Sequence, residues 1–108
     1  MGAELLNHTH LDTFFQEISN CFPNMVAGCI TDRHGFPVAS RMNKKTFDEE
    51  LLACSAISDR ELLDLSDYHK VVRSLDANVK LIVLLEKSWK NLYRFKLFDQ
   101  IVELHNPV

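Results

Sequence analysis

The stretch AGCITDRHGFPVASRM, residues 27–42, decides how the rest of the chain is interpreted. It belongs to two apolar runs, 25–31 and 36–42, which are joined by the polar corner DRHG. Asp32 opens this corner and can accept hydrogen bonds from the backbone beyond it, while Gly35 closes it and tolerates the positive φ that a bulged hairpin needs. We therefore predict a β-hairpin whose turn is formed by Asp32 and Gly35.

An amphipathic helix is expected immediately before this hairpin. Apolar residues recur there at the i, i+3, i+4, i+7 and i+11 positions that line one face of a 3.6-residue helix, namely Leu11, Phe14, Phe15, Ile18 and Phe22. Pro23 and Asn24 follow and should end the helix.

A second helix is expected to begin after the hairpin, because residues 46–49, TFDE, match the capping box with Thr46 as the N-cap. A helical wheel gives this helix two apolar sides, one formed by Phe47, Leu51 and Cys54 and the other by Leu52, Ala53 and Ala56. We assign the first side to the core. The second side is small enough for close helix approach, which favours self-association, although a helix that is simply well buried in a monomer would show the same pattern.

The second half of the chain reads as strands followed by a helix. Residues 59–65 fit either an extension of the second helix or an edge strand, whereas residues 69–75 are typical of a strand. Residues 79–86, VKLIVLLE, are apolar on both alternating faces, as in a central strand that is covered on both sides. Residues 90–105 then predict a broadly apolar helix. The expected fold is α+β, with helices covering both faces of one antiparallel or mixed sheet of about five strands.

Composition narrows the class of protein. The chain has 108 residues, 46% of them hydrophobic, and a formal charge of −3, so we expect one globular domain that does not bind nucleic acid. No apolar run approaches the roughly 20 residues of a membrane helix, and we expect a soluble, cytoplasmic protein without direct membrane insertion. The odd cysteine count, with no CxxC pair, indicates reduced core thiols.

Candidate catalytic and ligand-binding groups are few. His8 and His10, with Cys21 or Cys29, lack the ligand spacing of a metal site, and these cysteines lie among apolar residues rather than in the polar setting of a nucleophile. The acidic run 48–50 is explained by its place at a helix N-terminus. Glycine-rich phosphate loops do not occur. We therefore predict no catalytic residues, no cofactor and no metal.

The hairpin also resembles that of a known family. Residues 26–40, VAGCITDRHGFPVAS, are similar to the signature hairpin of the roadblock/dynein light chain family, in which a strand rich in small residues leads into an Asp-x-x-Gly turn and a second strand ending in Ala-Ser. The resemblance implies a single roadblock-like domain over residues 1–108, with residues 1–9 as a flexible N-terminus. It also implies a roadblock/longin-like arrangement, with the first and last helices on one face of the sheet and the second helix on the other.

The same resemblance carries an expected function. It implies a non-enzymatic scaffold, a homodimer or a heterodimer with another roadblock-like chain, which binds or regulates Ras-like small GTPases. Such dimers pair through the second helix and a neighbouring sheet edge, so we expect Leu52, Ala53 and Ala56 at the dimer interface. The alternative is a ligand-sensing module of the PAS or GAF kind, which would need an internal pocket with converging polar groups. The sequence offers few polar residues at core positions for such a pocket.

Overall fold

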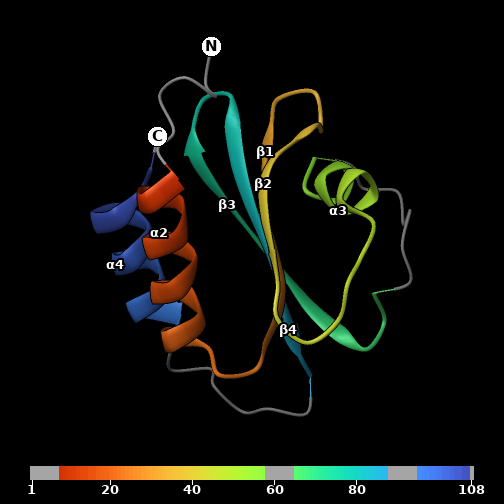
Figure 1. The fold of residues 1–108 in the computed structure, drawn as a ribbon, viewed down its shortest axis with the longest axis horizontal. Coiled ribbons are helices and arrows are strands. Elements are labelled where there is room, and N and C mark those ends of the chain that lie inside the picture. The colour runs from red at the N-terminus through yellow and green to blue at the C-terminus, as the bar shows by residue number, and fades with distance from the viewer. Residues whose placement is uncertain (1–7, 58–64, 88–94, 108) are drawn as a thin grey trace.

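The computed structural model describes residues 8–57, 65–87 and 95–107 (Figure 1). They form an α+β fold with three helices and one four-stranded antiparallel sheet. In chain order the elements are α2 (His8–Cys21), β1 (Met25–Asp32), β2 (Pro37–Met42), α3 (Glu49–Ser55), β3 (Tyr68–Asp76), β4 (Val79–Glu86) and α4 (Phe95–His105).

The sheet has the strand order β2-β1-β4-β3, so the first and last strands in sequence pair at its centre. In β4 the five residues from Leu81 to Leu85 are all buried, which confirms the prediction of a central strand covered on both faces. The described residues contain four strands, so the expected number of about five is not confirmed. The undecided stretch 59–65 falls almost entirely within residues 58–64, which lie outside the described part.

The helices form one layer on each side of the sheet, as expected from the sequence. Figure 1 shows the sheet nearly edge-on, with α2 and α4 side by side on one face and α3 on the other. Between α2, α4 and the sheet lies the larger hydrophobic cluster, which includes Phe14, Ile18, Phe22, Leu81 and Phe98. The smaller cluster lies under α3.

The first helix follows the sequence prediction except at its start. The five apolar residues predicted to line the first helix are all in the core, although Phe22 follows the end of α2, and the helix ends before Pro23 as expected. The helix already includes His8 and Thr9, which belong to the segment of residues 1–9 that we predicted to be a flexible N-terminus.

The second helix begins later than predicted. Asp48, not Thr46, is the N-cap of α3, and its Oδ1 accepts a hydrogen bond of 3.0 Å from the backbone N–H of Leu51. Phe47 therefore precedes the helix, where its ring packs edge-on against Tyr68 with 5.7 Å between centroids. The carboxylates of Glu49 and Glu50 lie in the first turn, where they complement the helix dipole.

The hairpin turn has the geometry that the sequence predicts. Asp32 Oδ1 accepts hydrogen bonds from the backbone N–H groups of His34 (2.8 Å) and Phe36 (3.0 Å), and Gly35 has a φ of +83°. A register shift between Ile30 and Thr31 supplies the bulge. Local chemistry at Asp32 and Gly35 thus fixes where the chain reverses.

We predict that Gly35→Ala lowers the free energy of unfolding by about 1–2 kcal/mol, because an L-residue at this φ is strained. A Cβ there would also lie 3.4 Å from Cys54 Cα. Thermal unfolding should show a Tm lower by roughly 4–8 °C per kcal/mol. Gly35→Asn should cost less, because asparagine tolerates the left-handed region. Equal stability of Gly35→Ala and the wild type would contradict this account of the turn.

Candidate interaction surface

The residues predicted to form the dimer interface lie inside the protein. Leu52 and Ala53 are 0% exposed and Ala56 is 7% exposed, and all three pack against the sheet. Their neighbours in this cluster include Val26, Ala27, Cys29, Ile82 and Leu84. Because the chain buries these three side chains itself, they do not face a partner, and the two sides of the helix are the reverse of the expected ones.

The reversal traces to where the helix begins. Phe47 is buried, but it precedes α3, so its burial says nothing about which side of the helix faces the sheet. The side grouped with Phe47 is instead the outer one: Leu51 is 37% exposed, Cys54 is half-buried, and Ile57, just beyond the helix, is 40% exposed. We call Leu51, Cys54 and Ile57 the outer face of α3.

The outer face of α3 is anchored on the hairpin turn. Cys54 Sγ donates a hydrogen bond of 3.5 Å to the carbonyl oxygen of Gly35. A Cβ placed on Gly35 would lie only 2.9 Å from Ile57 Cδ1, so the turn and the end of α3 are in close contact. Ser40 of β2 also donates to the Glu49 carboxylate at the start of the helix. Both ends of α3 are thus tied to the β1–β2 hairpin.

Beside α3, the sheet is only partly covered at β3. The helix packs chiefly on β1, β2 and β4, whereas Tyr68 and Val72 of β3 are only partly buried at the margin of the cluster under it. Lys70 donates from Nζ to the carbonyl oxygen of Ser55 (3.0 Å), which fixes the last turn of α3 next to β3. The outer face of α3 therefore adjoins the edge of the sheet that β3 forms.

The cysteine thiols differ in accessibility. Cys21 and Cys29 are buried and Cys54 is half-buried, and none of the three forms a disulfide bond. Burial, with a smaller contribution from Glu49, raises the pKa of Cys29 to about 12, so this thiol stays protonated at neutral pH and is a poor nucleophile. Within the described residues, no three His, Cys, Asp or Glu side chains gather into a group that could hold a metal ion.

Two hollows that are lined by described residues lie at the surface. One, of about 190 Å³, is formed where the start of α2 meets the end of α4, by His10, Thr13 and residues 104–107. Another, of about 380 Å³, lies beside Asp67, Tyr68, Glu86 and Lys87. Neither is the internal polar pocket that the ligand-sensing alternative requires.

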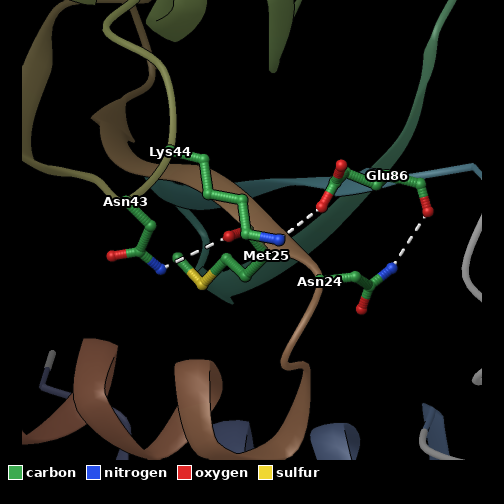
Figure 2. Close-up of polar contacts among 5 residues, drawn as sticks. All are labelled: Asn24, Met25, Asn43, Lys44 and Glu86. Carbon is green, nitrogen blue, oxygen red and sulfur yellow. Dashed lines mark hydrogen bonds and ion pairs between the residues drawn. The ribbon is translucent and has the colours of Figure 1, made fainter.

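A cluster of polar side chains lies where β1 begins and β4 ends (Figure 2). Asn24, which is buried, donates from Nδ2 to the carbonyl oxygen of Glu86 (3.0 Å), and the backbone N–H of Glu86 donates back to Asn24 O (3.1 Å). The Glu86 carboxylate pairs with Lys44, and Asn43 Nδ2 reaches Met25 O at 3.5 Å. These bonds tie the loop after β2 and the end of β4 to the start of β1. We interpret the cluster as structural.

Comparison with known proteins does not assign a role to this surface. No protein-family model matches the chain, and no curated protein matches it. In the described residues, no helix is both long enough and apolar enough to cross a lipid bilayer.

We predict that Cys54 reacts with a thiol reagent roughly tenfold or more faster than Cys21 and Cys29 in the native protein, because only Cys54 is accessible. Mass spectrometry after timed alkylation at pH 7.5 measures the modification of each residue. Cys54→Ser, the matched control, should remove the fast phase. Fast labelling of Cys29 in the folded state would contradict its burial.

We also predict that Asn24→Ala lowers the free energy of unfolding by about 1–3 kcal/mol, because it removes the buried Asn24 side chain that donates to the Glu86 carbonyl oxygen. Lys44→Ala is the matched control. It removes a pair whose side chains are 51% and 39% exposed, so it should cost less than about 1 kcal/mol. Urea unfolding measures the stability of both variants. Similar losses of stability would show that the hydrogen bond from Asn24 to Glu86 contributes no more than the exposed ion pair.

Proposed function

We propose that this chain is a non-enzymatic dimeric scaffold of the roadblock type that binds or regulates a Ras-like small GTPase. The observation that supports this most is the layered arrangement around the hairpin of residues 27–42. The first and last helices share one face of the sheet and the short α3 covers the other, as the sequence resemblance implies. Among the described residues, α3 is the one helix on its side of the sheet.

We place the dimer surface on the outer face of α3 and on the adjoining edge of the sheet, which β3 forms. Leu51 and Ile57 supply apolar area there, and partly buried Tyr68 and Val72 continue it onto β3. In the described residues β3 pairs with β4 alone, and such an end strand offers free backbone groups to another chain. The partner is a second copy or another roadblock-like chain.

The GTPase would bind to the assembled dimer and supply all the nucleotide chemistry. This division of roles agrees with the protonated, buried thiol of Cys29 and with a sequence that contains no phosphate-binding loop. We place the protein in the cytoplasm, where cysteines that form no disulfide stay reduced.

The dimer is tested by light scattering over a concentration series. We expect the wild type to show twice the chain mass at low micromolar concentration and Leu51→Arg with Ile57→Arg to show the single-chain mass, because two buried cations oppose association. Leu104→Arg, at a 79% exposed position on α4, is the matched control and should remain dimeric. Thermal unfolding checks that all variants fold. A dimer that survives the double substitution would contradict the proposed surface.

The GTPase role needs a separate measurement. Titration calorimetry of the dimer with a purified Ras-like GTPase, loaded in turn with GDP and with a non-hydrolysable GTP analogue, should show binding that differs between the two nucleotide states. The Leu51→Arg, Ile57→Arg variant should bind more weakly. If Ras-like GTPases from the same organism give no detectable heat of binding in either nucleotide state, the result would count against the proposal.

A further inference from the structure

The register of the sheet shows which backbone groups of β3 point away from β4. The backbone N–H of Glu86 donates to Asn24 O on the β1 side (3.1 Å), and that of Lys87 donates to Asp67 O on the β3 side (3.4 Å). Backbone groups alternate in direction along an antiparallel strand. With the observed pairing of β3 and β4, this alternation leaves three residues of β3 with outward N–H and C=O groups, namely Lys70, Val72 and Ser74.

The side chain of Arg73 reaches the middle of this outward edge. Its Nη1 donates to Val72 O at 3.0 Å, and its Nε donates to Asp99 Oδ1 of α4 at 2.7 Å. The Arg73 Cζ also lies 5.4 Å from the centre of the Phe98 ring. One guanidinium thus joins α4 to an outward carbonyl group of β3.

This arrangement affects what a further strand could do at β3. An added strand forms its ladder with the outward backbone groups, and Val72 O is the central acceptor among them. That oxygen already accepts from a charged donor, and such hydrogen bonds are stronger than those from a neutral amide. A partner strand would therefore gain its bond to Val72 O only after the Arg73 guanidinium moves away.

We propose that Arg73 is a latch that weakens strand pairing along β3, and that a second copy of this chain displaces it from Val72 O when the two sheets join. Antiparallel pairing of two copies about Val72 would place Lys70 opposite Ser74, so like charges would not face each other there. The proposal deepens the proposed function and rests on it for the occupant, because β3 is part of the proposed dimer surface. The latch would keep the dimer readily reversible.

Sedimentation equilibrium of the full chain measures the dissociation constant of self-association. We expect Arg73→Met to lower this constant at least roughly fivefold, because methionine keeps an apolar stem against Phe98 but has no donor for Val72 O. Arg41→Met is the matched control. Arg41 lies on β2 at the opposite edge and contacts Gln16 and Asn43, so this variant should stay within about twofold of the wild type.

A double variant separates the latch from an effect of net charge. Arg73→Met with Asp99→Asn removes one positive and one negative charge, so the formal charge of −3 is unchanged. We expect it to associate as strongly as Arg73→Met alone. Thermal unfolding checks that each variant is folded.

Two further measurements locate the gain at β3. Ser74→Pro removes an outward N–H, and added to Arg73→Met it should abolish the gain in affinity. In the Arg73→Met variant, amide hydrogen exchange at Lys70, Val72 and Ser74 should slow as the protein concentration rises. If the proline variant unfolds, the exchange measurement provides the same test.

The latch would be overturned if Arg73→Met did not associate, if its dissociation constant were no lower than that of the wild type, or if the slower exchange were confined to β2. The wild type reports separately on the proposed dimer. A wild type that stays a single chain, beside an Arg73→Met variant that associates through β3, would contradict the dimer and support the latch.

Discussion

The pairing of β1 with β4 is the constraint on which the rest of the structure depends. Both strands are buried on both faces, so each helical layer must pack on the same pair of strands. The approach of α2 is close at Gly28, opposite Val83, where an added Cβ would lie 2.8 Å from Met25 Cε and 3.2 Å from Phe15 Cε1. A slip of one residue in this ladder would exchange the side chains that face the two layers. The register therefore specifies both cores together.

Sequence reasoning succeeded where local chemistry decides the structure. The turn depends on a carboxylate and a positive φ within four residues, and β4 could be recognised because its apolar residues occupy both alternating positions. It failed at α3, a helix of seven residues with two possible N-caps, Thr46 and Asp48. Amphipathicity showed that this helix has two apolar sides. Which side faces the sheet depends on tertiary packing with β1 and β4, which the helix sequence does not contain.

The outer face of α3 could have been found from the sequence with a different starting point. Taking Asp48 as the cap separates Phe47 from the helix and leaves Leu52 and Ala56, four residues apart, as a sheet-facing pair. The sequence does not show, however, which of the neighbouring basic residues pairs with an acid. In the fold Lys44 pairs with Glu86, whereas Arg41 contacts the neutral side chains of Gln16 and Asn43.

The contact between Gly35 and Cys54 joins the hairpin turn to the outer face of α3. The chain reverses at Gly35, and the Gly35 carbonyl oxygen accepts a hydrogen bond from the thiol that lies in the outer face of α3. A ligand that shifts the tip of the hairpin thereby changes the free energy of placing the last turn of this helix. By thermodynamic linkage, a protein that binds the outer face of α3 would in turn bias the position of the hairpin turn. One thiol–carbonyl contact thus links the geometry of the turn to that of the last turn of the helix.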